Sequence, residues 1–207
     1  MTILNPKDFS SKLIKIPLLS YLSDNARNSF ANKCRWVEFR ANDTVIERGR
    51  EDTNVYFIIT GSVHVQNYSK TGRIVTYAIF EEGDMFGELA AIDGLPRSAW
   101  VCTITPCQMA TAPGSEFLNL LSYSPETSLA LLRRMSSDIR LLDERLADLT
   151  LLGAEQRACT ELLRMAKPDW EDPGGYVVSP MLTHANFANL VGVSRETVSR
   201  IFRKLRE

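Results

Sequence analysis

The stretch FEEGDMFGELAAIDGLPRSAWV, residues 80–101, combines a glycine turn, a short helical run and one arginine. Gly87 permits close backbone approach, and residues 88–91 can form a helical turn whose unpaired N–H groups attract an anion. Arg97 can bind phosphate oxygens through two parallel hydrogen bonds, and Ser98 adds a hydroxyl donor. Glu88 repels a phosphate, so we expect it to accept a hydrogen bond from a sugar hydroxyl. From these residues alone, an ion pair between Glu88 and Arg97 beside a simple turn fits equally well.

The surrounding segment, from about Cys34 to Pro113, alternates short β-branched or aromatic runs with glycine-bearing turns. The predicted strands are VYFIITG (55–61), SVHVQNY (62–68), RIVTYAIF (73–80), SAWVCTI (98–104) and CQMATA (107–112). Strands spaced this closely favour an antiparallel barrel or jelly roll over alternating β-α units. We therefore predict an all-β segment that follows a short helical stretch.

Between about Ser115 and Leu152 the pattern becomes helical. Apolar residues recur there at spacings of 3, 4, 3, 4 and 3: Leu132, Met135, Ile139, Leu142, Leu146 and Leu149. Such a heptad seam predicts a helix that pairs with its twin from a second subunit, and hence a homodimer. The alternative is that the same stripe packs onto the chain's own core.

The last segment begins near Gly153 with the helical run AEQRACTELLRMA (154–166) and a predicted hairpin, KPDWEDPGGYVVSP (167–180). Thr183 can cap a helix, Gly192 suits the tight turn after it, and Ser194 can cap a second helix running to the end. From Thr183 onward there are five basic and two acidic residues, a local charge of +3, although the whole chain carries −1. This concentration of charge predicts a nucleic-acid contact at the C-terminal end.

The predicted DNA contacts divide into base readers and phosphate contacts. Arg195 and Arg200 can pair with guanine, and Glu196 can accept from cytosine N4, so these three are the expected base readers. The expected phosphate contacts are Thr197, Ser199 and Arg203. The capping residues Thr183 and Ser194 are also expected at the DNA interface.

Two motifs resemble a known family. Gly87-Glu88-Leu89-Ala90 followed by Arg97-Ser98-Ala99 resembles the phosphate-binding cassette of cyclic-nucleotide-binding domains, in which the glycine and glutamate hold the ribose and phosphate and the arginine and hydroxyl residue hold the cyclic phosphate. Residues 191–200, VGVSRETVSR, look like the helix-turn-helix of the catabolite activator protein (Crp/Fnr) family of bacterial transcription regulators. The resemblance spans nearly the whole chain.

The resemblance implies an α+β fold with three parts. These are a cyclic-nucleotide-binding β jelly roll over 1–114, a long dimerisation helix over 115–152, and a winged helix-turn-helix over 153–207, whose wing we expect to be cut short at Glu207. It also implies a cytoplasmic homodimer that cAMP or cGMP switches allosterically. The implied partners are double-stranded DNA with palindromic, TGTGA-like half-sites and RNA polymerase, with no membrane.

The chain departs from the family on the long helix. In the cAMP-responsive members a threonine-serine pair contacts adenine, and Leu142 and Asp143 occupy those positions here. Leu142 offers only apolar contact, whereas Asp143 can accept from the adenine amino group or from guanine N1 and N2. Both cAMP and cGMP therefore remain open as ligands.

Other functional classes lack support in the sequence. The four cysteines are scattered without a CxxC pair or a neighbouring His, and no Ser/His/Asp set or Walker-type loop is present, so we expect no metal, cofactor or catalytic residue. No apolar run has the length of a signal sequence or a membrane span. Two alternatives remain: a regulator of the same family with another trigger or none, and a sensor module that acts on a protein partner.

Overall fold

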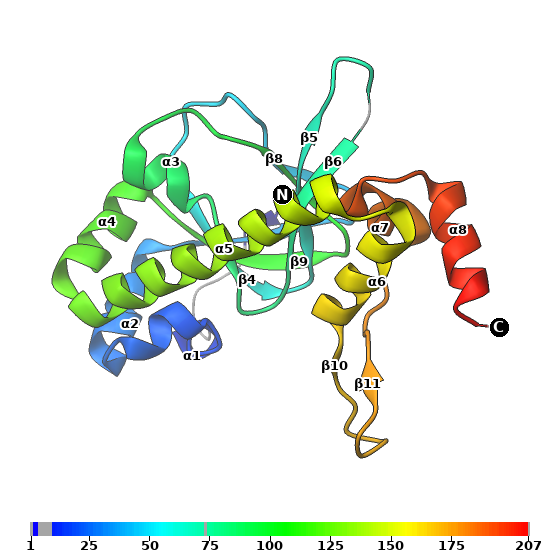
Figure 1. The fold of residues 1–207 in the computed structure, drawn as a ribbon. Coiled ribbons are helices and arrows are strands. Elements are labelled where there is room, and N and C mark those ends of the chain that lie inside the picture. Colours follow the sequence, from blue (N-terminus) through cyan, green and yellow to red (C-terminus); the bar gives the residue numbers. More distant parts are fainter. Residues whose placement is uncertain (1, 4–9, 73, 207) are drawn as a thin grey trace. The chain divides into compact units, whose positions relative to one another are not determined.

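The structure is a computed structural model that describes residues 2–3, 10–72 and 74–206. The chain forms two compact units, one built from residues 1–72 and 77–136 and the other from residues 73–76 and 137–207 (Figure 1). Three boundaries predicted from the sequence fall outside the described residues. They are the start of the sensor segment at Met1, the start of one strand at Arg73 and the end of the DNA-binding segment at Glu207.

A short helical stretch precedes the sheets, as predicted. After strand β1 (Thr2–Ile3), the helical stretch comprises α1 (Ser10–Leu13), the 3-10 helix η2 (Pro17–Tyr21) and α2 (Asp24–Lys33). Ser23 begins α2 by accepting a hydrogen bond from the Ala26 N–H through its side chain. The buried guanidinium of Arg27 donates to the carbonyls of Leu19 and Leu22 and so joins α2 to η2.

Two antiparallel sheets form the β domain, which confirms the predicted jelly roll. Their strands are β2 (Arg35–Phe39), β3 (Thr44–Ile46), β4 (Val55–Thr60), β5 (Val63–Tyr68), β6 (Ile74–Phe80), β7 (Met85–Phe86), β8 (Trp100–Thr103) and β9 (Cys107–Ala112). The sheet orders are β1-β2-β9-β4-β7 and β3-β8-β5-β6. Both sheets contribute to one buried cluster that includes Ile58, Val63 and Val101. Alternation along each strand places these side chains on the inner face.

The predicted long helix is present, but it begins later than the sequence suggested. Helix α4 (Gly114–Tyr123) and helix α5 (Pro125–Leu151) replace the single helix expected over 115–152. Ser124 is extended because a residue before proline disfavours helical geometry, and its hydroxyl accepts a hydrogen bond from the Thr127 N–H at the start of α5. Proline also suits a first helical turn, where no N–H bond is lost.

The C-terminal segment has the predicted order of elements. It contains α6 (Ala154–Met165), the hairpin strands β10 (Lys167–Pro168) and β11 (Tyr176–Val177), α7 (His184–Val191) and α8 (Arg195–Lys204). Both predicted caps are confirmed: the Thr183 hydroxyl accepts from the Asn186 N–H, and the Ser194 hydroxyl accepts from the Thr197 N–H. Gly192 adopts the left-handed conformation (φ +69°) between α7 and α8. Among the described residues, no helix combines the length and apolar character that crossing a bilayer requires.

Candidate ligand cassette and nucleic-acid interface

The cassette backbone requires glycine at position 87. Strand β7 leads through Gly87 (φ +89°) into the predicted short helix, α3 (Glu88–Asp93). A Cβ atom on Gly87 would lie 2.7 Å from the Asn54 carbonyl oxygen and 2.8 Å from Arg97 Nη1. Any other residue would therefore be strained and would collide with the arginine and with the loop before β4.

Arg97 is held by four hydrogen bonds within the domain and is only 4% exposed. Its Nε donates to Asp52 Oδ2 (3.2 Å), and its Nη2 donates to Asp52 Oδ1 and to the Asn54 carbonyl. Its Nη1 donates to the Gly87 carbonyl (2.9 Å). A guanidinium has five N–H groups, and four of them are used by described residues, so one N–H on Nη1 remains for a further acceptor. The guanidinium is thus fixed beside the start of α3.

The acidic partner of Arg97 is Asp52, not Glu88 as the simpler reading of the sequence suggested. Burial raises the pKa of the Asp52 carboxyl, but the hydrogen bonds and the charge of Arg97 outweigh burial and hold this pKa below its ordinary value. Asp52 lies 45 positions from Arg97 in the chain, in the loop before β4. No local pattern in the sequence pointed to this pairing.

The remaining cassette residues differ in exposure. Leu89 and Ser98 lie at the surface, Glu88 is half-buried, and Ala90 and Ala99 are buried, so the two alanines provide packing rather than side-chain contacts to a ligand. The structure brings all of these together with Gly87 and Arg97 in one compact unit. Leu142 and Asp143 are exposed and belong to the other compact unit, so their contact with a nucleotide stays a prediction.

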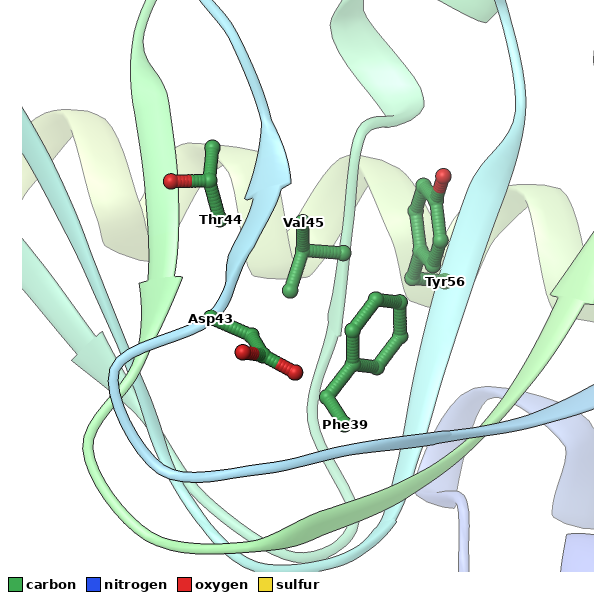
Figure 2. A pocket seen from close by; sticks show the side chains of 5 residues that line it. All are labelled: Phe39, Asp43, Thr44, Val45 and Tyr56. Carbon is green, nitrogen blue, oxygen red and sulfur yellow. The ribbon is translucent and has the colours of Figure 1, made fainter. Parts of the chain in front are cut away.

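A cleft of about 420 Å³ lies near the cassette in the β domain. Figure 2 shows its lining, in which the rings of Phe39 and Tyr56 lie beside Val45, with Asp43 and Thr44 completing the wall. Tyr56 stacks on Phe86, the residue before Gly87, with ring centroids 5.1 Å apart. Burial raises the pKa of the Tyr56 phenol, and the negative charge of Asp52 adds to this shift. None of the predicted cassette residues lines this cleft. Within the described part of the chain, no three His, Cys, Asp or Glu side chains gather as metal ligands.

Helix α8 presents the predicted base readers at the surface. Arg195, Glu196 and Arg200 are exposed, whereas Val198 and Ile201 pack into the core of the C-terminal segment. Glu196 bonds to its own backbone N–H and to the Ser194 hydroxyl, and these hydrogen bonds, followed by the nearby charge of Arg195, lower its pKa. Within residues 10–72 and 74–206, neither Arg195 nor Arg200 forms an ion pair. Both guanidinium groups are therefore available to a partner.

Two of the predicted phosphate contacts already have intramolecular partners. The Ser199 hydroxyl lies 2.8 Å from His184 Nδ1, and the His184 ring packs edge-on against Phe202. The Thr197 hydroxyl lies 3.1 Å from that of Ser194. These contacts join α7 to α8 and fix the start of α8, so Ser199 and Thr197 help to orient the helix. The sequence did not single out His184, whose role depends on a contact between two helices.

The heptad seam on α5 is largely exposed in the single chain. Its exposed members are Leu132, Ile139, Leu142, Leu146 and Leu149. Only Met135 packs partly against the core of the β domain. The sequence left open that the whole stripe packs onto the chain's own core. The structure does not show such packing.

An ion-pair network joins the end of α5 to α6. Glu161, which is buried on α6, pairs with Arg145 of α5 and with Arg164 of its own helix. Arg164 in turn pairs with Asp148 (2.7 Å) and Glu144 (3.4 Å) of α5. The last turns of α5 and helix α6 are thus held together by opposite charges on both sides of Gly153.

Two family descriptions match consecutive parts of the chain. Residues 36–124 match the cyclic nucleotide-binding domain, and residues 156–207 match the Crp-like helix-turn-helix domain. The cAMP-activated global transcriptional regulator CRP of Salmonella typhimurium is 30% identical over 86% of this chain and 85% of its own length. The CRP-like cAMP-activated global transcriptional regulator of Mycobacterium tuberculosis is 33% identical over 79% of this chain and 74% of its own.

Solved structures show the same fold. The c-di-GMP responsive global regulator CLP of Xanthomonas campestris superposes with a TM-score of 0.71, at 22% identity, over 89% of this chain and 92% of its own. The catabolite activator protein of Thermus thermophilus gives a TM-score of 0.58 at 22% identity, covering 92% and 86%. With both domains matched in this order and a relative that is 30% identical over 86% of this chain, the chain belongs to the Crp/Fnr family of DNA-binding transcription regulators that carry a cyclic-nucleotide-binding domain.

Proposed function

We propose that the protein is a homodimeric transcription regulator whose affinity for DNA changes when cAMP or cGMP binds the cassette. The observation that carries the proposal is Arg97, a guanidinium fixed beside Gly87 and the start of α3 with one N–H left for an acceptor. A cyclic phosphate supplies such an acceptor. Ser98 adds a surface hydroxyl, and Glu88 takes a ribose hydroxyl because a carboxylate can only accept.

The dimer is proposed to form along the exposed seam of α5. Leu146 is 63% exposed, and the other exposed seam leucines are similar, which is unusual for a continuous apolar stripe on a helix surface. Knobs-into-holes packing against a second copy would cover the seam at its 3-4 spacing. Two copies of α8 then face two half-sites of a palindromic operator about one helical turn apart, ~34–36 Å.

The DNA contacts follow from the charges on α8. Arg195 and Arg200 are proposed to read guanine and Glu196 cytosine in TGTGA-like half-sites, with Arg203 on phosphates. Four hydroxyl residues support these contacts by fixing the starts of α7 and α8 and the contact between the two helices: Thr183, Ser194, Thr197 and Ser199. By analogy with the family, RNA polymerase is a further partner. A protein that binds both DNA and RNA polymerase in a bacterium acts in the cytoplasm.

Calorimetric titration tests the ligand. The purified protein is titrated separately with cAMP, cGMP and cyclic di-GMP, because the curated relatives are named for cAMP and the Xanthomonas regulator for cyclic di-GMP. Arg97→Gln should lose binding of the cyclic mononucleotide. Arg50→Gln is the matched control, because it removes the same charge from an exposed residue whose ion-pair partner is Glu47.

A gel shift with a TGTGA palindrome, with and without the bound nucleotide, tests the coupling. Nucleotide should increase specific binding in the presence of competitor DNA, and added salt should weaken it. Binding of nucleotide without any DNA binding would instead favour a sensor that acts on a protein partner. DNA binding without any nucleotide response would indicate another trigger.

A further inference from the structure

Asn67 is a buried polar residue on the inner face of β5 that the cassette chemistry does not use. Its side chain is only 9% exposed, and its Oδ1 atom is buried with no hydrogen-bond partner among the described residues. Val63 and Val65, which share its face by alternation, pack into the apolar core of the β domain. An aliphatic side chain at position 67 would complete this pattern.

The contacts of the Asn67 amide fix its orientation. Its Nδ2 donates to the Tyr77 hydroxyl (3.0 Å), and the Ser98 carbonyl lies at 3.5 Å from the same nitrogen. Both contacts are on the nitrogen, so the oxygen is the atom left without a donor. Ser98 is the hydroxyl residue that follows Arg97 in the cassette. The amide therefore lies directly beside the cassette, between β5 and β6.

An unsatisfied buried acceptor destabilises a folded protein, because the group gives up its hydrogen bonds to water and gains none in return. Violations of local rules are expected at functional or strained sites. At a functional site, a ligand can supply the missing partner. The missing partner here is a hydrogen-bond donor close to Ser98. The base of a nucleotide bound through its phosphate at Arg97 and Ser98 lies one ribose away from that phosphate.

We propose that Asn67 is a specificity-determining residue whose Oδ1 accepts a hydrogen bond from an N–H group of a cyclic purine nucleotide. The inference rests on the proposed function, since it requires that the cassette holds the cyclic phosphate. Adenine offers its N6 amino group and guanine its N2 amino group as donors. Base reading thereby involves strand β5 of the same unit as the cassette, whatever Leu142 and Asp143 add from the long helix.

Three ligands with the same cyclic phosphate and ribose test the proposal by calorimetry: cAMP, cGMP and the 3′,5′-cyclic phosphate of purine riboside. The last has no N–H group on its base. The wild-type protein should bind the better of cAMP and cGMP about threefold to tenfold more tightly than the purine analogue, the effect of one neutral hydrogen bond. This comparison needs no variant and therefore does not depend on the folding of a mutant.

Two variants separate base reading from a structural role. Asn67→Leu is close in size, should bind all three ligands with similar affinity, and should keep or raise the midpoint of denaturant unfolding because it removes the unsatisfied oxygen. Gln66→Leu is the matched control on the opposite face of β5. Its buried amide is satisfied, donating to the Tyr68 hydroxyl at 2.6 Å, so this variant should lose stability and keep the ligand preference.

The results distinguish the inference from the proposed function. Equal binding of the three ligands by the wild-type protein, or an unchanged preference in Asn67→Leu, would overturn the role of Asn67 while leaving the cassette in place. A marked loss of stability in Asn67→Leu would also count against it, because it would make Asn67 a structural amide. Failure of the wild-type protein to bind any of the three ligands would refute the cassette assignment itself.

Discussion

Replacing Asp52 with asparagine removes the charge that opposes Arg97 while keeping the shape of the side chain. In the folded protein the Arg97 side chain is 3% exposed and that of Asp52 is 41% exposed, so the pair is half-buried. In Asp52→Asn the guanidinium keeps the carbonyls of Gly87 and Asn54 as acceptors. Its charge, however, is left without a counter-charge in a buried position.

The expected loss of stability lies between two known limits. Removing one partner of a fully buried ion pair costs about 3–5 kcal/mol. Exposed pairs contribute about 0–1 kcal/mol because water screens them. For a buried arginine with a partly exposed partner and two retained hydrogen bonds, we expect a loss of about 1–3 kcal/mol in the free energy of unfolding of the β domain.

The dependence on pH has a definite sign. The pKa of Asp52 is lowered in the folded protein, so its ion pair contributes stability that is fully present above the ordinary pKa of an aspartate, about 4. That contribution is lost as the pH falls through the lowered pKa. The stability difference between wild type and Asp52→Asn should therefore be constant at neutral pH and shrink only in acid below about pH 4.

Urea unfolding followed by tryptophan fluorescence and circular dichroism measures this difference. Glu51→Gln is the control, since it removes the same charge from the neighbouring exposed carboxylate and should change stability by less than about 0.5 kcal/mol. Equal midpoints for wild type and Asp52→Asn at neutral pH would refute the reasoning, because they would mean that Arg97 needs no counter-charge in the folded state.

Three further predictions concern the helix seam, the DNA interface and the cassette turn. Leu146→Glu should convert the dimer to a monomer in sedimentation velocity, because two carboxylates would face each other in the seam. Leu163→Glu, at an even more exposed position on α6, should not. Arg200→Ala should lower affinity for the correct operator by about 1–3 kcal/mol and relax selectivity at one base pair, measured by competition gel shift, whereas a uniform loss across sequences would make it a phosphate contact. Gly87→Ala should weaken nucleotide binding at least tenfold by calorimetry, because the new Cβ would collide with Arg97 and an alanine is strained at φ +89°. The control Gly72→Ala, with a similar φ of +79° and open space around it, should leave binding intact.

The sequence predicted the features that depend on neighbouring residues. Alternating apolar runs located the strands, and Thr183 and Ser194 were identified as caps because a hydroxyl followed by a helical run is a local signal. Gly87 was identified for the same reason, since the turn before a short helix favours glycine. Pro125 is also a local signal, but it was not used in the sequence analysis, which expected one helix over 115–152 where the structure has two.

Features that depend on contacts between distant segments were not predicted. Asp52 approaches Arg97 only because the sheets bring the loop before β4 to the cassette. His184 meets Ser199 because α7 and α8 pack at close range. Asn67 reads in the sequence as an ordinary polar residue of a strand, and only its burial beside Ser98 distinguishes it.

The ion pairs around Glu161 matter for anyone who exchanges modules between regulators. A chimera joined at Gly153 would graft α6 without Arg145, and the buried Glu161 carboxylate would lose a partner that lies 16 positions upstream. The transplanted module would then unfold more readily, unless the helix of the new sensor supplied a basic residue in the place of Arg145. The natural cutting point lies inside the long helix, before Glu144, so that the last turns of α5 travel with the DNA-binding segment they are paired to.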